Sequence, residues 1–112
     1  MALKIKDIRL MKRYLEGIMD RANHHAQQVN EIVLALAGGV IWRGAEIDVR
    51  TYNGETANML WMKTDLGKEY CFIFNHNNGM IEVHEETMNG RLLRQFSNTN
   101  KTYDVKAFFE DM

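Results

Sequence analysis

Apolar residues recur every three or four positions along the first 40 residues of the chain. The series consists of Ile8, Met11, Leu15, Ile18, Ala22, Ala26, Val29, Val33, Leu36 and Val40. This spacing is typical of an amphipathic helix, and it persists for roughly nine turns, whereas an average helix has three or four. One helix of that length would extend beyond a small sheet. Either the segment contains a break, or part of its apolar stripe contacts a second subunit.

The apolar series is weakest between Asp20 and His25, where alanine replaces larger residues. Asp20 and Asn23 are both favourable helix N-caps, so we expect a break there and two helices, near residues 6–21 and 24–37. A single long helix over residues 6–37 is the alternative. Gly38-Gly39 is expected to cap the second helix, because glycine readily adopts the conformation that ends a helix.

The remainder of the chain reads as short strands separated by turn signals. The turn signals are Asn53-Gly54, Leu66-Gly67, Asn78-Gly79 and Asn89-Gly90. They predict a roughly five-stranded antiparallel meander with strands near residues 46–52, 58–63, 69–75, 80–86 and 91–97. Thr102 is a suitable cap for a short C-terminal helix, in which Phe108 and Phe109 belong to the apolar side. The sequence therefore predicts an α+β fold and a single domain over residues 1–112.

Pairing the central strands through two-residue turns predicts one apolar face of the sheet. That face carries Met59, Trp61, Tyr70, Phe72, Phe74, Ile81 and Val83. The opposite face mixes Leu60, Met62, Cys71 and Ile73 with Glu82, His84 and Glu86. An antiparallel sheet that faces water usually alternates apolar and polar residues cleanly. We therefore expect a helix or a second subunit to cover part of the opposite face.

The charge balance and the single cysteine narrow the function classes. The chain has 14 basic and 15 acidic residues and a net charge of −1, so we expect no nucleic-acid partner. Residues 1–10 show no continuous apolar run and no small-residue cleavage site, and no 18 apolar residues run together anywhere in the sequence. We therefore expect no export signal, no membrane association and a cytoplasmic location. Cys71 is the only cysteine, which excludes an internal disulfide and suits a reducing compartment.

No arrangement of residues predicts a catalytic, cofactor or metal site. His24 and His25 are adjacent, so their side chains diverge on a helix and cannot chelate one ion together. Cys71 lies inside a strand, without a glycine elbow or a helix N-terminus to activate it. Glu82 and His84 share a strand face with Glu86, which would suit acid–base or metal chemistry, but a solvated polar face is the simpler interpretation.

The weak candidates for binding are Trp42, Arg43, His76 and His84. Trp42 and Arg43 follow the predicted helix cap and could contact a partner, although the simpler interpretation is that Trp42 packs under the helix–sheet junction and Arg43 is solvated. His76 lies in the turn signal that ends at Gly79, where short polar side chains commonly bind turn amides.

Several segments resemble proteins encoded by integron gene cassettes. They are Asn23-His24-His25-Ala26, Val29-Asn30-Glu31-Ile32, Leu34-Ala35-Leu36-Ala37-Gly38, Ile41-Trp42-Arg43, Asn58-Met59-Leu60-Trp61 and Phe96-Ser97-Asn98. The resemblance extends over about residues 5–109, with Phe74 where the pattern has tyrosine. It implies a small α+β protein of a mobile element, and it implies no catalytic residue.

Three functions agree with these observations. The first is a small self-associating binding or adaptor protein, most simply a homodimer, that uses the helical stripe or the opposite sheet face. In that case Val29→Glu would give a folded monomer. The second is a small enzyme or ligand-binding protein with a pocket between helix and sheet, lined by Trp42 and Trp61. The third is a mobile-element defence or immunity protein that occludes a partner with a charged patch.

Overall fold

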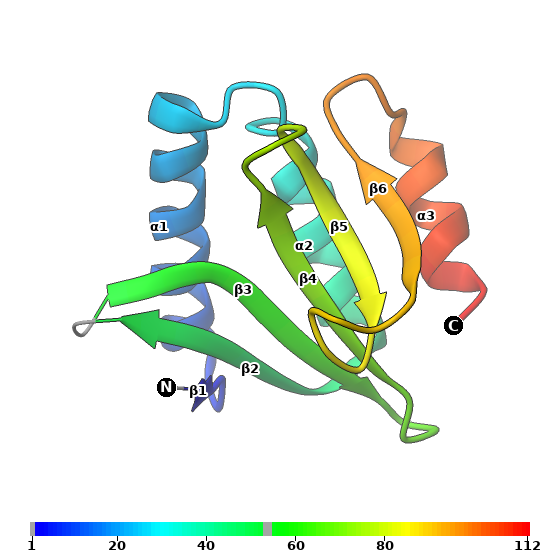
Figure 1. Cartoon of the computed structure of the whole chain (residues 1–112). Helices are drawn as coiled ribbons and strands as arrows, with labels where there is room; N and C mark the ends of the chain where they lie inside the picture. The colour runs from blue at the N-terminus through cyan, green and yellow to red at the C-terminus, as the bar shows by residue number, and fades with distance from the viewer. Residues whose placement is uncertain (1, 53–54) are drawn as a thin grey trace.

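The structure is a computed structural model that describes residues 2–52 and 55–112. The elements within these residues are β1 (Ala2–Lys4), α1 (Ile8–His25), α2 (Ile32–Arg43), β2 (Gly44–Tyr52), β3 (Glu55–Thr64), β4 (Glu69–Asn75), β5 (Met80–Glu85), β6 (Leu92–Phe96) and α3 (Thr102–Glu110). The strands form one antiparallel sheet in the order β1-β2-β3-β4-β5-β6, with the helices behind it (Figure 1). The predicted α+β meander is confirmed. β1 is an additional edge strand, too short to carry a sequence signal.

The N-terminal helical segment is broken, but the break lies later than predicted. α1 begins after Asp7, whose carboxylate accepts a hydrogen bond from the Leu10 amide at 2.9 Å, and it continues through His25. α2 begins only at Ile32. The cap of α2 comes from Asn98, whose Oδ1 accepts hydrogen bonds from the Glu31 and Ile32 amides at 3.0 Å each. Because Asn98 is far from α2 in the sequence, the residues around the start of α2 carry no local sign of this cap. The prediction from local capping propensity therefore placed the break too early.

Gly38-Gly39 does not end the second helix, which continues to Arg43. Gly39 instead permits a close approach between α2 and α3. A Cβ atom at Gly39 would lie 2.2 Å from two ring carbons of Phe109, a side chain that is itself fully buried. Glycine is therefore required here for packing and not for a turn.

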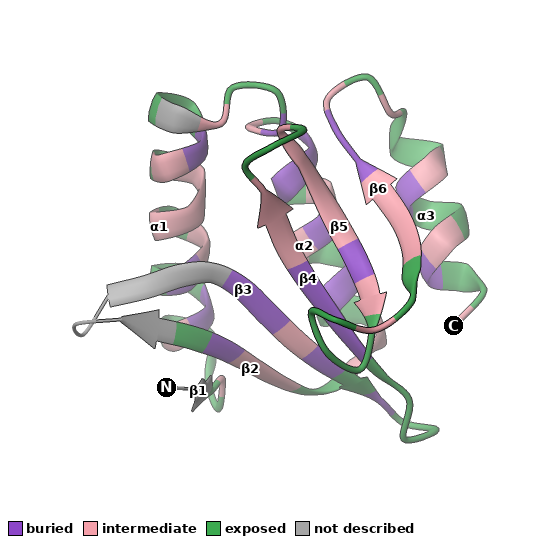
Figure 2. Cartoon of the chain, in the orientation of Figure 1, coloured by how far each residue is buried: buried purple, intermediate pink, exposed green. Residues whose placement is uncertain are grey.

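Most residues of the apolar series in the two helices are buried against the protein's own core. Met11, Ala22, Val29, Val33, Leu36 and Val40 are buried, whereas Ile8 remains 69% exposed (Figure 2). Tyr14 of α1, Val33 of α2 and Phe109 of α3 join one core with side chains of β3 to β6. The break between α1 and α2 lets both helices cover a single sheet face, so the stripe has little surplus for a partner.

The register of β3 on β4 differs by one residue from the prediction. Leu60 pairs with Phe72, and Thr64 and Lys68 close a longer loop than the predicted two-residue turn at Leu66-Gly67. Since adjacent side chains point to opposite faces, the shift moves Leu60 and Met62 into the core and places Met59 and Trp61 on the other side. The predicted faces of β4 and β5 are correct. The turn predicted at Asn53-Gly54 lies outside the described residues.

Candidate functional site

We use the term second face for the sheet surface opposite the core. Cross-strand pairing places Lys4, Asp48, Trp61, Cys71 and His84 in one row on this face. Trp61 is partly exposed, and Cys71 is fully buried. Among the described elements, the loop of residues 86–91 contacts this row, through the Gly90 carbonyl at His84. Outside the core, the second face is therefore the surface on which titratable and aromatic side chains lie together.

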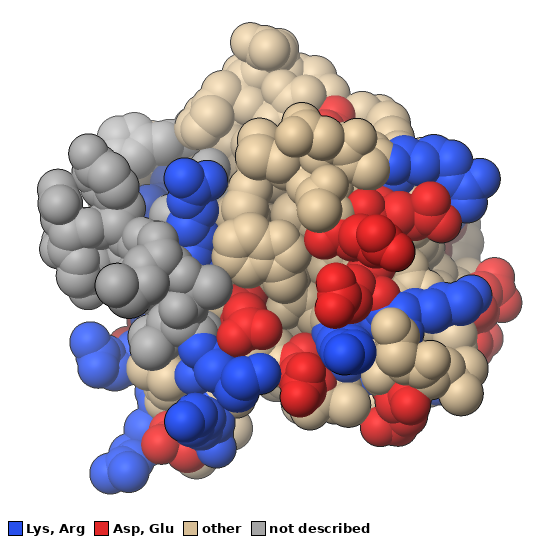
Figure 3. Space-filling model, turned by 60° about the horizontal axis from the view of Figure 1, so that its bottom comes forward, with Lys and Arg blue, Asp and Glu red and all other residues tan. Residues whose placement is uncertain are grey.

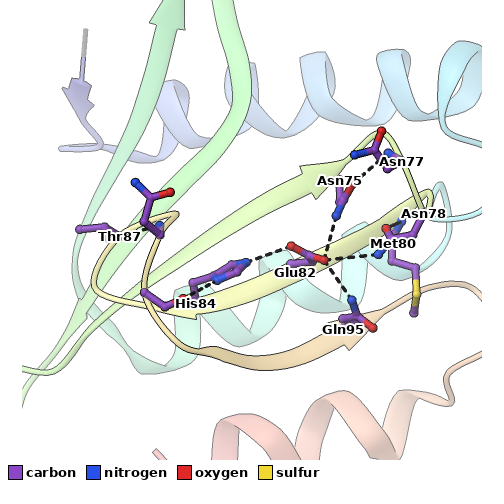
Figure 4. A network of polar contacts seen from close by, with 10 residues as sticks. Asn75, Asn77, Asn78, Met80, Glu82, His84, Thr87 and Gln95 are labelled. Carbon is purple, nitrogen blue, oxygen red and sulfur yellow. Dashed lines mark hydrogen bonds and ion pairs between the residues drawn. The ribbon is translucent and has the colours of Figure 1, made fainter.

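Glu82 lies at the centre of a hydrogen-bond network on the second face (Figure 4). Its Oε2 accepts hydrogen bonds from the side-chain amides of Asn75 at 3.0 Å, Asn78 at 3.3 Å and Gln95 at 3.0 Å. Its Oε1 lies 2.9 Å from His84 Nε2. The side chains of Glu82 and His84 are each only 13% exposed. This network is more sheltered than the solvated strand face that the sequence predicted.

His84 has a hydrogen-bond acceptor at each ring nitrogen. Nδ1 lies 2.9 Å from the carbonyl oxygen of Gly90, and Nε2 lies 2.9 Å from the ionised carboxylate of Glu82. Neither acceptor can donate, so His84 makes both hydrogen bonds only when both ring nitrogens carry hydrogen, that is, as an imidazolium. Burial alone lowers the pKa of His84, but the contacts with Gly90 and Glu82 outweigh it and raise this pKa above the usual 6.5.

Glu82 is the matching anion. The hydrogen bond from His84, followed by that from Asn75, lowers the pKa of its carboxyl group to about 2. Hydrogen bonds to the charged form of a carboxylate favour that form. Glu82 is therefore an anion near neutral pH, and it forms a charged pair with His84 whenever His84 is protonated. The remaining acceptor capacity of Glu82 is taken by amides.

Cys71 lies directly opposite His84 in the β4–β5 pairing, which gives the second face a cysteine, a histidine and a glutamate. A catalytic thiol needs a histidine nitrogen within hydrogen-bond reach, and both nitrogens of His84 are already engaged. Burial also raises the pKa of the Cys71 thiol to about 11. This arrangement does not activate Cys71 as a nucleophile.

A shallow depression of about 210 Å³ lies beside this row. Its lining residues are Glu46, Asp48, Trp61, Met62, Lys63 and Glu69. Lys4 lies 3.8 Å from Glu46 and 3.9 Å from Asp48, so two of the lining carboxylates already have a cationic neighbour. Seen from below the view of Figure 1, acidic and basic side chains are interleaved (Figure 3). The depression therefore has no strong charge of one sign.

Trp42 and Arg43 occupy the last turn of α2 and not a segment beyond a helix cap. Trp42 is 54% exposed, so it does not fill the helix–sheet junction. The Arg43 guanidinium lies 5.4 Å from the centre of the Trp42 ring and donates a hydrogen bond to the carbonyl oxygen of Met112. These contacts fix Arg43 and leave the Trp42 ring accessible.

The predicted binding candidates do not form one site. His76 belongs to the β4–β5 turn, where its ring packs edge-on against the ring of Phe74, with 4.9 Å between the ring centroids. His84 lies near the other end of β5, and Trp42 projects from the helix layer. Trp61 points to the second face, so Trp42 and Trp61 cannot line a common pocket between helix and sheet.

Sequence reasoning found Glu82 and His84 through their spacing of two but missed the amides that bind Glu82. Gln95 pairs directly with Glu82 across β5 and β6, a relation that only the strand register reveals. Glu86 does not join the network, because it follows β5 with a positive φ of 62° and is exposed.

No group of three or more histidine, cysteine, aspartate or glutamate residues in ranges 2–52 and 55–112 has an arrangement that could hold a metal ion. No helix in the described part of the chain has the length and apolar character to cross a membrane.

The chain matches a known protein family. The model of the family described as "Integron cassette protein VCH_CASS1 chain" matches residues 11–104, which include α2, the core strands and the Glu82 network. No curated protein matches the chain. The match agrees with the resemblance noted in the sequence.

Proposed function

We propose that this chain, which belongs to the integron cassette protein family, is a small self-associating binding protein whose contact surface is the outer side of α2. The observation that supports the proposal is the exposure of large apolar residues on this helix. Leu34 is 57% exposed, Ile41 is 53% exposed and Trp42 is 54% exposed. The surface differs from the one expected from sequence, because Val29 and Val33 are buried inside the chain.

The composition of α2 favours a covered outer side. Its residues from Ile32 to Trp42 are all apolar or glycine, and a helix that is apolar all round is normally buried all round. The core covers only the side that carries Val33, Leu36 and Val40. The exposed side chains of Leu34, Ile41 and Trp42 remain uncovered on the other side, and the largest apolar patch of a monomer is often functional.

A second copy of this chain is the partner that fits best. Arg43 is the only charged residue of α2, and its guanidinium is bound to the chain's own Met112 carbonyl. Arg43 is the last residue of α2, so the uncharged residues 32–42 of two copies can meet without opposing charges. At Gly38 a Cβ atom would have no neighbour within 4 Å, so a second helix could approach the backbone there. A standard interface buries about 800 Å² per partner, so we expect neighbouring side chains to complete a rim around this apolar centre.

The test is the solution mass by light scattering after size exclusion, from low micromolar to submillimolar concentration. We expect the wild type to become dimeric as concentration rises and Ile41→Glu to remain a folded monomer. Ile8→Glu is the matched control, because Ile8 is also an exposed isoleucine at a helix surface but lies on α1. A wild type that stays monomeric throughout, or an Ile41→Glu variant that associates like Ile8→Glu, would contradict the proposal.

The other two hypotheses have weaker support. The pocket hypothesis required Trp42 and Trp61 together, and they lie on opposite sides of the sheet. The immunity hypothesis predicted a charged, exposed patch, and on the second face Lys4 and Lys63 lie among the acidic residues, so this surface offers a partner no strong net charge.

A further inference from the structure

We propose that His84, Glu82 and the loop of residues 86–91 form a pH-sensitive latch, which is closed when His84 is doubly protonated and released when it is neutral. The proposal is independent of the α2 surface. It rests on the geometry of one imidazole between two acceptors, of which one is the backbone of the loop and the other is a fixed carboxylate.

The carboxylate side of the latch is immobile. Three side-chain amides, from Asn75 and Asn78 at the β4–β5 turn and from Gln95 on β6, hold Glu82 Oε2 in place. Glu82 Oε1 therefore stays directed at His84 Nε2 whatever the loop does. The hydrogen bond from His84 to Glu82 is charge-assisted, which makes it about twice as strong as one between neutral groups.

The loop side of the latch is the weaker contact. A neutral imidazole has a single N–H, so it can donate to Glu82 or to Gly90 but not to both. The stronger bond to Glu82 retains the proton at Nε2, and the Gly90 carbonyl then loses its donor. Deprotonation thus acts on the loop and leaves the sheet beneath it intact.

Other contacts determine how far the loop can move. The Gly90 amide bonds to the Thr87 carbonyl at 2.9 Å, and Arg91 lies 3.2 Å from Glu85 on the exposed side. The Glu86 amide bonds to the Glu69 carbonyl at 3.0 Å and anchors the start of the loop. We therefore expect a local opening around residues 87–90, where Met88 is already 46% exposed.

The groups near His84 leave Glu82 as its main electrostatic partner. By register, its charged or titratable neighbours on the second face are Glu82 on β5, Cys71 and Glu69 on β4, Lys63 on β3, and Glu86 at the start of the loop. Glu69 pairs with Lys63 across β3 and β4, and the Cys71 thiol is neutral near neutral pH. Leu92, the β6 residue opposite His84, is apolar.

The first measurement is an NMR titration of the histidine ring nitrogens in the full chain. We expect both nitrogens of His84 to carry hydrogen below pH 6.5 and its titration to occur above that of a free imidazole. A neutral His84 at mildly acid pH would overturn the proposal.

The second measurement is amide hydrogen exchange from pH 5.5 to 9, expressed as protection factors so that the intrinsic pH dependence cancels. We expect the protection factors of the Thr87 and Gly90 amides to fall as pH rises through the titration of His84. The fall should be tenfold for each unit by which the pKa of His84 with the loop closed exceeds its pKa with the loop open. Protection at Phe72 should not change over this range. Loop protection that is independent of pH would overturn the proposal even if His84 titrates as expected.

Two variants separate the latch from a general effect of histidine. Glu82→Gln removes the anion but keeps the size, so the His84 titration and the fall in loop protection should both move to lower pH. His76→Gln changes another histidine in the same hairpin and should leave the loop protection profile unchanged. If Glu82→Gln does not fold, His84→Gln offers a second comparison, because its loop should be equally protected at every pH.

Discussion

The two faces of the sheet come from the same strands but are stabilised by different interactions. Phe72, Val83 and Phe96 face the helices and are 7%, 0% and 0% exposed, in an apolar core. On the second face, Glu82 and His84 form a charged pair within a network of amides. Because successive side chains of a strand point to opposite faces, one sheet can have an apolar core on one face and a charged network on the other. The helix side should therefore respond to changes in volume, and the second face to changes in charge and pH.

The largest difference is expected between adjacent residues of β4. Phe72→Ala should lower the free energy of unfolding by about 3–5 kcal/mol, because it removes a buried ring that stacks on Phe109 at 6.0 Å. Ile73→Ala, on the partly exposed second face, should cost about 1 kcal/mol. Urea denaturation of both variants measures the difference. Equal losses would mean that the second face is packed as tightly as the core.

The two glycines of α2 give a sharper test of packing on the helix side. Gly39→Ala should destabilise the protein by about 2–3 kcal/mol, because the new methyl group would overlap the Phe109 ring. Gly38→Ala meets no atom of its own chain within 4 Å, so at concentrations where the protein is monomeric it should stabilise the fold by about 0.5–1 kcal/mol through helix propensity. Thermal and urea unfolding of the pair would reveal the opposite signs. Destabilisation by Gly38→Ala would indicate that the outer side of α2 is already covered.

The smallest of the three effects concerns pH and the second face. Because the folded pKa of Glu82 is low, its contribution is present above its unfolded value near 4.5 and is lost as pH falls toward 2. Because the folded pKa of His84 is raised, its contribution is present below 6.5 and is lost as pH rises through the folded value. The network should therefore stabilise the protein most between pH 4.5 and 6.5.

This pH dependence can be isolated with one variant and its control. The linkage of Glu82 has an upper bound of about 3 kcal/mol, which partial solvent access reduces to about 1–2 kcal/mol. The difference in unfolding free energy between wild type and Glu82→Gln should show that maximum at mildly acid pH. Glu86→Gln, at an exposed residue outside the network, should show a flat difference. A flat profile for Glu82→Gln would mean that the network adds no net stability.

The buried position of Val29 changes what the sequence-based test would report. Val29 is 1% exposed in the core, so Val29→Glu would place a carboxylate among apolar side chains and unfold the chain. Loss of association in that variant would say nothing about an interface. Ile41, on the outer side of α2, is the informative position for the proposed self-association.

Parts of the fold that depend on local pattern could be predicted. The period of the apolar residues gave the N-terminal helical segment, and glycine turn signals gave the meander and most strand bounds. β4 was predicted as residues 69–75 and is observed as Glu69–Asn75. The terminal helix was also predicted correctly, but its cap was not, because Thr102 is the first helical residue and Lys101 is the N-cap. These features depend on interactions between near neighbours, which a single sequence displays directly.

Features that depend on distant partners could not be predicted. The start of α2 is fixed by Asn98, which also donates from Nδ2 to the Gln27 carbonyl at 3.0 Å. The need for glycine at position 39 comes from the ring of Phe109, 70 residues later in the chain. The Glu82 network needed the β5–β6 register before Gln95 could be recognised as a partner. In each case the deciding contact joins segments that the chain order keeps apart.

The sequence by itself determined the fold class, the order of the strands and the family, because periodicity, turn residues and family pattern are written in consecutive positions. The tertiary structure decided which side of β3 faces the core, where the long helical segment breaks and which apolar surface remains exposed. A one-residue difference in loop length exchanges the two faces of a strand, and local propensity does not control that length. The physical reason is that register and helix ends are set by packing and hydrogen bonds across the whole chain.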